Sequence, residues 1–501
     1  MSSTFRFDPA TDRRYKMLID GLWVDGSTDE VFRCVDPFTG APWGEVPVAS
    51  PDDVDAAVRA ARRSFDDSWS VTSPQTRAAL LRKLALLIEA NAAELARAQI
   101  HENGKLMSEM SAGTQSLALM ANYFAGLAES DHGISVSSSI PSKTHYTLRE
   151  PVGVVAAITP WNSPLTLLGL KLFPALAAGC TIVIKPSEVT PTSTLRIGEL
   201  CQEAGFPPGV INIVTGSGPV GQTLVEHRGV DKITFTGSTE TGERIAMTAA
   251  TRLARVSLEL GGKAPNIVFA DADVDNALHG VMAGIFGATG QTCMAGSRVL
   301  VEQGIYAEFA VRLAEKASRL RLGDPLDAST EVGPIAHKAQ LKKVLSYVGI
   351  GLEGGAELMT GGRRPNSPHL ASGLFVEPTV FASVNGKSRL AQEEIFGPVA
   401  SIIPFVHEDD AIRIANDTRF GLTAGVWTEN VGRAQRMIHR LKSGTVWVNT
   451  YRVGHYAVPY GGVKESGIGR EGGPHSLDEF TETKTAWIDH GTRQTFGRSS
   501  G

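Results

Sequence analysis

Cys293 is the side chain of this sequence best suited to nucleophilic chemistry. It lies in FGATGQTCMAGSR (286–298), a run of small residues that lets the backbone pass close to a ligand. A cysteine in such a run can attack an electrophilic carbon as its thiolate. Free cysteine is also among the most buried residue types, so the run by itself favours an inert cysteine on a tight turn. The rest of the chain reverses that preference.

Two further side chains have types suited to acyl chemistry. Asn162 lies between the prolines of PWNSP (160–164), where its amide is a rigid donor for a developing oxyanion. Glu259, in LELGG (258–262), ends an apolar strand, and burial there would raise its pKa towards the range of a general base. Taken singly, such residues are more often structural than catalytic.

Glycine turns and a charged pair indicate a nucleotide site. GSGPVG (216–221) and GSTETG (237–242) each follow an apolar strand, and each can present backbone N–H groups to a pyrophosphate. The first matches GxGxxG, which is a weak signal alone, but two such turns on one sheet favour a dinucleotide site. Lys185 and Glu188 follow the strand TIVI (181–184), where open α/β sheets bind ligands. They can hold ribose hydroxyls or form a solvated charge pair.

The elements that must position these residues form two α/β series. Between 152 and 262, strands rich in Val and Ile alternate with helices, which predicts a parallel sheet covered on both faces. A second series follows Gly262, and we expect a hinge near Gly261 and Gly262. The strands are predicted at 152–159, 181–186, 210–214, 233–237 and 256–262, and then at 267–270, 299–302, 400–405 and 445–449.

The N-terminal part is predicted to be scaffold. A strand pair is expected at 18–24 and 31–35, joined by the turn residues between them. Ser73, followed by proline, predicts a helix start, and Gly104 is its expected stop. The polar segment 135–150 is either an exposed β-ribbon, which another subunit would need to cover, or a plain surface loop.

Composition argues against several classes of partner. A net charge of −5 without a long basic run disfavours nucleic acid and anionic membranes. Four cysteines in 501 residues, none in a CxxC pair or near clustered histidines, disfavour a disulfide framework and a metal site. Residues 1–16 contain no apolar signal-like run, so the cytoplasm is the expected compartment. Because Lys171, Pro174 and Gly179 interrupt the apolar window 165–184, we interpret it as a buried helix and strand.

Seven motifs then share one order and spacing along the chain. They are PWNSP (160–164), KPSE (185–188), FTGSTETG (235–242), LELGGK (258–263), GQTCMAGSR (290–298), EEIFGPV (393–399) and PYGGVKESGIGRE (459–471). In type, order and spacing, over essentially the whole chain, they are similar to those of the hydrolytic, NAD(P)-dependent aldehyde dehydrogenase superfamily.

The resemblance implies a covalent mechanism for oxidising a small-molecule aldehyde. The thiolate of Cys293 would attack the carbonyl, and the Asn162 amide, together with the backbone N–H of Cys293, would stabilise the oxyanion. Hydride transfer to the nicotinamide would leave a thioester, and Glu259 would activate the water that releases the acid. Lys171 and Glu471 match positions implicated in proton relay, and no metal is required.

The same resemblance implies NAD as cofactor. It places Lys185 and Glu188 at the adenosine ribose and moves the GxGxxG turn towards the adenine, so that the GSTETG turn takes the phosphates. Glu188 would repel a 2′-phosphate, which favours NAD over NADP, although Lys185 leaves dual use open. The implied cofactor contacts are Thr159, Trp161, Lys185, Glu188, Gly218, Gly237, Ser238, Glu394 and Phe396.

The fold implied by the resemblance is α/β, with two doubly wound domains and a small β oligomerisation arm. The Rossmann-like NAD-binding domain would comprise 1–128 and 151–261, the catalytic domain 262–461, and the arm 129–150 and 476–490. The arm makes a homodimer or homotetramer the expectation.

Two departures from the family pattern concern the active-site surroundings. Ala288 stands where asparagine is common, and we expect local repacking there. The loop 451–458 carries Arg452, His455 and Tyr456 where apolar or aromatic residues are common in the family. Ser163, Leu167 and Leu170 line the matching helix, where family members that act on small aliphatic aldehydes tend to be bulkier, so we expect a roomier, partly polar pocket. The alternatives are a CoA-acylating enzyme, against which Glu259 argues, and a non-catalytic relative, against which the retained residues argue.

Overall fold

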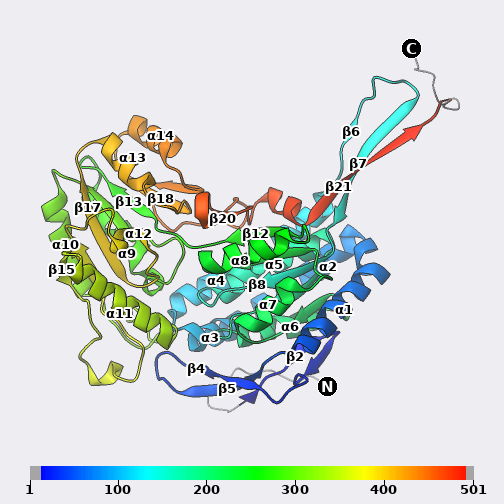
Figure 1. Cartoon of the computed structure of the whole chain (residues 1–501), viewed down its shortest axis with the longest axis horizontal. Helices are drawn as coiled ribbons and strands as arrows, with labels where there is room; N and C mark the ends of the chain where they lie inside the picture. Colours follow the sequence, from blue (N-terminus) through cyan, green and yellow to red (C-terminus); the bar gives the residue numbers. More distant parts are fainter. Residues whose placement is uncertain (1–12, 492–501) are drawn as a thin grey trace.

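Two open β-sheets lie side by side and a long β-ribbon leads away from them (Figure 1). The computed structural model describes residues 13–491. A small third sheet, in the order β1-β5-β4, lies at the N-terminal edge; its strands are β1 (Arg13–Arg14), β5 (Pro42–Pro47) and β4 (Val31–Val35).

The first sheet has eight strands within the described residues, in the order β20-β12-β11-β8-β9-β10-β2-β3. The five from β12 to β10 are parallel, and β20 and β2 join them antiparallel at the two sides. The strands are β20 (Gly467–Ile468), β12 (Arg255–Glu259), β11 (Lys232–Thr236), β8 (Val154–Ile158), β9 (Thr181–Lys185), β10 (Ile211–Ile213), β2 (Met17–Ile19) and β3 (Leu22–Val24).

Helices cover both faces of this sheet because its strands are apolar on both sides. In β8, Val155 and Ala157 pack into one core, whereas Val154, Ala156 and Ile158 pack into another, as the two-residue period of a strand requires. The first core holds α2 (Pro74–Ala90), α3 (Ala92–Asn103), α4 (Met107–Ser130), α5 (Pro164–Ala178) and α6 (Thr192–Ala204); the second holds α1 (Pro51–Asp67), α7 (Gly218–Glu226) and α8 (Thr239–Ala250).

The second sheet repeats this construction with seven described strands, in the order β15-β16-β17-β14-β13-β18-β19. Its strands are β15 (Glu357–Thr360), β16 (Thr379–Ala382), β17 (Val399–Phe405), β14 (Arg298–Glu302), β13 (Pro265–Val268), β18 (Thr423–Trp427) and β19 (Thr445–Val448). One face carries α9 (Val274–Ile285) and α10 (Tyr306–Ser318); the other carries α11 (Lys338–Glu353), α12 (Arg389–Gln392), α13 (Glu408–Asn416) and α14 (Val431–Arg440). The 3-10 turns are η1 (Trp69–Val71), η2 (Gly287–Gly290), η3 (Pro368–Leu370), η4 (Lys464–Ser466) and η5 (Pro474–Glu479).

The chain passes from the first sheet to the second between Glu259, the last residue of β12, and Pro265, the first of β13. The predicted α/β class, its two parallel sheets and the crossing near Gly261 and Gly262 are therefore confirmed. Whether this crossing acts as a hinge stays a prediction.

The predicted pairing of the first strands is wrong. Within the expected strand 18–24 the chain turns back at Asp20 and Gly21, with φ of 52° and 76°, so that β2 pairs with β3. A two-residue Asp-Gly turn with both φ values positive matches the twist of a hairpin, which explains this choice. The strand at 31–35, β4, pairs with β5 in the small sheet instead.

The helix predicted from Ser73 to Gly104 is two helices. The Ser73 hydroxyl caps α2 by accepting from the backbone N–H of Thr76 at 3.2 Å, and α3 ends at Gly104, as expected. Between them the Asn91 side chain donates to the carbonyl of Leu87 at 2.8 Å. Asparagine competes in this way with the helical backbone, which accounts for the break.

The apolar window 165–184 is the helix α5 followed by the strand β9, as predicted, and both are buried in the first sheet. No helix within the described residues is long and apolar enough to span a bilayer.

The polar segment 135–150 forms a β-ribbon, which decides between the two sequence-based alternatives. Its strands β6 (Ser135–Val136) and β7 (Lys143–Pro151) pair antiparallel, and β7 pairs along its whole length with β21 (Thr481–Asp489) (Figure 1). The ribbon exposes the apolar side chains of Ile134, Val136, Ile140, Leu148, Trp487 and Ile488. Such exposed apolar side chains on a projecting ribbon are typical of a surface that another protein covers.

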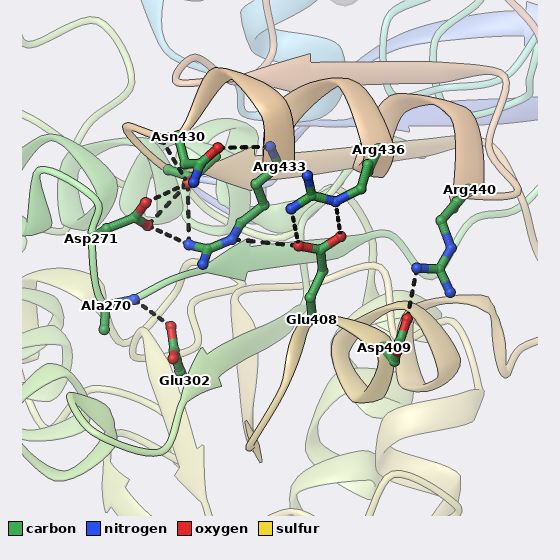
Figure 2. Close-up of polar contacts among 10 residues, drawn as sticks. Ala270, Asp271, Glu302, Glu408, Asp409, Asn430, Arg433, Arg436 and Arg440 are labelled. Atoms are coloured by element: carbon green, nitrogen blue, oxygen red, sulfur yellow. Dashed lines mark hydrogen bonds and ion pairs between the residues drawn. The ribbon is translucent and has the colours of Figure 1, made fainter.

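Ion pairs, rather than apolar burial, hold α14 against its neighbours (Figure 2). Met437 is the buried residue of this helix, whereas Glu408 accepts from Arg436 Nε at 2.7 Å and from its Nη2 at 2.6 Å. Arg433 contacts Asp271 at 2.7 Å and lies over the ring of Phe269. Because one carboxylate receives two arginines, Glu408 is the centre of this network.

Replacement of Glu408 by glutamine should therefore destabilise the protein by about 1 kcal/mol at low ionic strength, and less in high salt. The hydrogen bond from Arg436 holds the pKa of Glu408 below its usual range. Its contribution is therefore complete above about pH 4.3, the ordinary glutamate value, and is lost as the pH falls through the lower folded-state pKa. Thermal unfolding at several pH and salt values measures this.

The matched control is Asp409→Asn, because Asp409 pairs with Arg440 but is 80% exposed. It should cost less than Glu408→Gln at every salt concentration. Equal losses for the two variants would contradict the central role of Glu408.

Candidate active site

The turn before Cys293 is held in an uncommon backbone conformation. Ala288 and Thr289 in η2 have φ of 54° and 55°, a left-handed region that asparagine tolerates better than alanine. The carboxylate of Glu109 accepts from the N–H of Ala288 at 2.6 Å, and the Thr289 hydroxyl donates to the carbonyl of Gly333 at 3.1 Å. These bonds hold the turn in place where this chain lacks asparagine.

The crossing between the two sheets brings the base and the nucleophile loop together. Gly262 lies so close to the carbonyl oxygen of Cys293 that any Cβ there would collide with it. The N–H of Gly262 donates to Glu394 Oε1 at 2.8 Å, so a third predicted residue joins the same point. Gly262 is only three positions after Glu259 in the chain. The structure thus places Cys293, Glu259 and Glu394 around one crossing.

Asn162 is buried and attached to the nucleophile loop. Its Nδ2 donates to the carbonyl of Gln291 at 3.1 Å, two residues before Cys293. Gln291 is itself fixed, since its amide oxygen accepts from the N–H of Ala336 at 2.9 Å. An amide carries two N–H donors, so Asn162 can hold the loop with one and offer the other to an oxyanion.

Cys293 is the partly exposed one of the four free thiols, whereas Cys34, Cys180 and Cys201 are buried. Desolvation, together with the smaller effects of the charges of Glu259 and Glu394, raises the pKa of Cys293 to about 11. A hydrogen bond with Tyr460 and the charge of Lys105 act in the opposite direction and lower this pKa. The resting thiol therefore needs a proton acceptor before it can attack.

Glu259, whose charge acts on Cys293, is a candidate for that acceptor. It is 4% exposed, and neither carboxylate oxygen has a hydrogen-bond partner among the described residues. Burial, followed by the charge of Glu471, raises its pKa well above the usual range, and Lys171 and Arg470 counteract this. A buried carboxyl group with its oxygens free can take a proton from a thiol or from water.

Lys171 and Glu471 form a buried ion pair behind Glu259. Nζ of Lys171 contacts Glu471 Oε1 and donates to the hydroxyl of Thr236 at 2.7 Å. Both charged side chains are buried, and the second carboxylate oxygen of Glu471 has no hydrogen-bond partner among the described residues. The two charged residues were predicted from the sequence, whereas the hydrogen bond from Lys171 to Thr236 is seen only in the structure.

The ribose-side residues lie at the carboxyl end of β9. Lys185 is buried, its Nζ donates to the carbonyl of Pro186 at 2.9 Å, and desolvation lowers its pKa to about 8. Glu188 is exposed, with its carboxylate 3.9 Å from that amine. A buried cation beside an exposed carboxylate can hold a ligand that approaches from solvent.

The other predicted cofactor residues lie around the same sheet edge. Ser238 is exposed and caps α8, and Gly218 begins α7, so that both are at helix N-termini. The hydroxyl of Thr159 is buried without a hydrogen-bond partner among the described residues. The ring of Trp161 packs edge-on against that of Phe396, with centroids 5.2 Å apart. Gly237 precedes Ser238, and its N–H donates to the carbonyl of Glu259 at 3.0 Å.

These features fit a dinucleotide. The N-termini of α7 and α8 can bind phosphates. The buried hydroxyl of Thr159 can hydrogen-bond to a polar atom of the ligand, and the rings of Trp161 and Phe396 can pack against a flat ring of the ligand. In residues 13–491, no group of three or more His, Cys, Asp or Glu side chains could hold a metal ion.

Tyr460 is the functional residue that sequence reasoning missed. Its hydroxyl lies 3.5 Å from Cys293 Sγ, although 167 positions separate the two residues in the chain. It belongs to the quoted motif 459–471, but nothing in the sequence shows that its ring faces the nucleophile.

The loop residues that depart from the family pattern lie at different places. Arg452 donates to the carbonyl of Ala283 at 3.0 Å, and His455 stacks on Tyr456, whose ring also packs against Tyr123. The expected size and polarity of the substrate pocket stay a prediction.

Comparison with known proteins agrees with this geometry. Residues 23–486 match the sequence profile of the aldehyde dehydrogenase family. Betaine aldehyde dehydrogenase of Bacillus subtilis (strain 168) is 43% identical over 470 residues, covering 93% of this chain and 96% of that protein. A 5-hydroxybutyrolactone dehydrogenase of Acinetobacter baylyi, "(Z)-2-((N-methylformamido)methylene)-5-hydroxybutyrolactone dehydrogenase", is 44% identical, with 95% and 97% covered. Among solved structures, betaine aldehyde dehydrogenase of Staphylococcus aureus in complex with NAD+ has a TM-score of 0.95 at 39% identity, with 97% of both chains covered.

The buried ion pair of Lys171 and Glu471 leads to a prediction about the free energy of unfolding. Lys171→Met would leave Glu471 charged, buried and uncompensated, which typically costs about 3–5 kcal/mol. The double variant Lys171→Met/Glu471→Leu removes both charges and should melt at a higher temperature than Lys171→Met alone, in scans at equal protein concentration. Additive losses from Lys171→Met and Glu471→Leu would show that the two charges do not compensate each other.

Proposed function

Because the chain belongs to the aldehyde dehydrogenase family, we propose that it oxidises an aldehyde to a carboxylic acid with NAD+ through a thioester on Cys293. The observation that carries the proposal is the convergence of a partly exposed thiol, an anchored amide and a buried carboxyl group with free oxygens at one crossing. The NAD+ complex of the Staphylococcus aureus relative supports the choice of cofactor.

In the first step Glu259 takes the proton of Cys293, and the sulfur attacks the aldehyde carbon. The electron pair of the carbonyl bond moves to oxygen, where Nδ2 of Asn162 and the backbone N–H of Cys293 stabilise it. One such donor is typically worth about 3–4 kcal/mol in the transition state. When bound, NAD+ supplies the hydride acceptor that makes oxidation to the acyl level possible.

In the second half of the reaction Glu259 activates a water molecule, which adds to the thioester carbonyl and displaces the sulfur. The raised pKa of Glu259 makes it a stronger base than an ordinary carboxylate. Lys171 and Glu471 lie behind it, and the charge of Glu471 acts on Glu259 directly. We assign them to carry the proton away from Glu259 towards solvent.

For the cofactor, we assign Lys185 and Glu188 to the adenosine ribose, and Ser238, with Gly237 and Gly218 nearby, to the phosphate side. Glu394 and Phe396 would hold the nicotinamide ribose and ring, with Thr159 and Trp161 beside them. For the residues of the first sheet, the support is their position after its strands and at the N-termini of α7 and α8. Glu394 and Phe396 come from the segment before β17, and they meet this edge through the N–H of Gly262 and the ring of Trp161.

The larger organisation is also part of the proposal. We assign cofactor binding to 1–128 and 151–261 and catalysis to 262–461, since the first two ranges hold the first sheet except for its edge strand β20, and the third holds the second sheet. The ribbon, together with 476–490, is proposed to pair subunits as a homodimer or homotetramer, supported by its exposed apolar side chains. A cytoplasmic location agrees with four free thiols, because reducing compartments keep thiols unpaired.

The mechanism predicts that Glu259→Gln slows both half-reactions, because Glu259 is the base in each. The NADH burst should be slower than in the wild type, and steady-state turnover with an aldehyde should fall by about 100-fold or more, because neither the thiol nor the hydrolytic water is deprotonated efficiently. Stopped-flow absorbance with a panel of aliphatic, aromatic and semialdehyde substrates measures both phases.

Cys293→Ala is the control and should produce no NADH in either phase. Wild-type turnover by Glu259→Gln would contradict the assigned base. A wild-type burst that continues only when CoA is added would indicate the CoA-acylating reaction instead.

The cofactor assignment predicts the effect of Glu188→Gln. Removing the exposed negative charge should raise kcat/KM for NADP+ by about tenfold relative to that for NAD+, since a like charge near a 2′-phosphate is repulsive. Glu203→Gln, at an exposed glutamate on α6, is the matched control and should leave the ratio unchanged. An unchanged NADP+/NAD+ ratio in Glu188→Gln would remove Glu188 from the ribose site.

A further inference from the structure

The hydroxyl of Tyr460 contacts the reacting sulfur, and the mechanism above gives it no task. Its Oη lies 3.5 Å from Cys293 Sγ, a hydrogen-bond distance for the large sulfur atom. Among the described residues, Tyr460 is the hydrogen-bond partner of the Cys293 side chain. The contact is to the atom that forms and breaks a covalent bond.

The backbone fixes Tyr460 against the other catalytic groups. Its N–H donates to the carbonyl of Glu471 at 2.7 Å, and its carbonyl accepts from the N–H of Glu471 at 2.8 Å. The next residue, Gly461, packs on the base, since a Cβ there would lie 2.6 Å from Glu259 Oε1. The ring is therefore held at a set distance from both nucleophile and base.

The direction of the hydrogen bond follows from the charges. A thiolate has no proton and can only accept. Burial, together with the charges of Cys293 and Glu259, raises the pKa of Tyr460 well above its usual value, so the phenol keeps its proton. When the sulfur is ionised, Tyr460 must therefore be the donor, and hydrogen bonds to ionised acceptors are the strong ones.

We propose that Tyr460 is a catalytic residue whose hydroxyl donates a hydrogen bond to the sulfur of Cys293 whenever that sulfur carries negative charge. The inference rests on the proposed function in taking Cys293 as the nucleophile. In this proposal Tyr460 stabilises negative charge on the sulfur, whereas Asn162 stabilises negative charge on the substrate oxygen.

This donor acts at two points of the reaction. Before attack, the thiol proton goes to Glu259 and the resulting thiolate accepts from Tyr460; the S–C bond then forms and the carbonyl pair moves to oxygen. In hydrolysis the same S–C bond breaks, its electron pair returns to sulfur, and Tyr460 again stabilises the thiolate. Tyr460 keeps its proton in both steps, so it donates a hydrogen bond without transferring the proton.

Other groups around the sulfur make this donor necessary. Glu259 and Glu394 face the thiol with negative charge and raise its pKa, while Lys105 lowers it from the other side. Lys105 is itself buried, donates to the hydroxyl of Ser163 at 2.9 Å, and has its pKa lowered to about 8. Lys105 is therefore mostly charged at neutral pH and loses its charge above about pH 8, whereas the hydroxyl of Tyr460 keeps its proton there.

The test is the pH dependence of thiol alkylation in the full-length protein, which needs no turnover. Tyr460→Phe keeps the ring and removes the hydroxyl, and should move the midpoint of iodoacetamide alkylation upward by about one to two pH units. At pH 8 alkylation should slow by about tenfold or more, and kcat should fall with little change in KM. Mass spectrometry locates the label, and Cys293→Ala should show none.

Tyr451→Phe is the matched control. The hydroxyl of the buried Tyr451 donates at 3.0 Å to the backbone carbonyl of Met294, the residue after Cys293, and not to the sulfur. The alkylation midpoint of Tyr451→Phe should match that of the wild type. If Tyr460→Phe does not fold, 3-fluorotyrosine at position 460, a stronger donor, should move the midpoint downward.

An unchanged alkylation midpoint in folded Tyr460→Phe overturns the proposal, including when turnover is lost, since the hydroxyl would then serve packing alone. Equal shifts in Tyr460→Phe and Tyr451→Phe overturn it as well. Failure of the proposed function looks different: Tyr460→Phe would show the expected shift relative to the wild type, but none of the aldehydes would yield NADH with the wild type.

Discussion

The close approach of the Cys293 carbonyl to Gly262 is the contact on which the active site depends. The chain leaves the first sheet at Glu259 and enters the second at Pro265, and the nucleophile loop of the second sheet packs against this short crossing. A side chain at Gly262 would push the loop away from the base. One steric constraint thus joins groups that the two sheets present separately.

Burial of Cys293 and Glu259 changes their reactivity, and it makes their charged forms less stable. Desolvation raises the pKa values of Cys293 and Glu259, which makes the thiol reluctant to ionise and the carboxylate a better base. Several groups offset the effect of burial on these charges. Lys171 pairs with Glu471, whose charge acts on Glu259, and the hydroxyl of Tyr460 contacts the sulfur of Cys293. Fixed partners in a dry site need little rearrangement as charge develops, which is the usual origin of electrostatic catalysis.

The periphery uses different physics from the core. The two sheets are covered by helices that bury continuous apolar faces, whereas α14 is held by arginine–carboxylate pairs that remain partly in water. The ribbon of β7 and β21 buries little and leaves apolar side chains exposed. Apolar burial is therefore concentrated in the cores of the two sheets, while the outer elements are available for contacts with other molecules.

The sequence by itself determined the α/β class and the order of the central strands along the chain, and it supplied the candidate residues from which the active site is proposed. These follow from local properties: strand and helix periodicities are short-range, and motifs such as LELGGK and GQTCMAGSR carry their glycines beside the reactive side chain. It failed where two local solutions compete, as at Asp20–Gly21, where an earlier hairpin turn displaced the expected pairing. Only the tertiary structure decided that Tyr460 meets Cys293 and that Thr236 holds Lys171, because such contacts join residues far apart in the chain and depend on how the strands are ordered across the sheet.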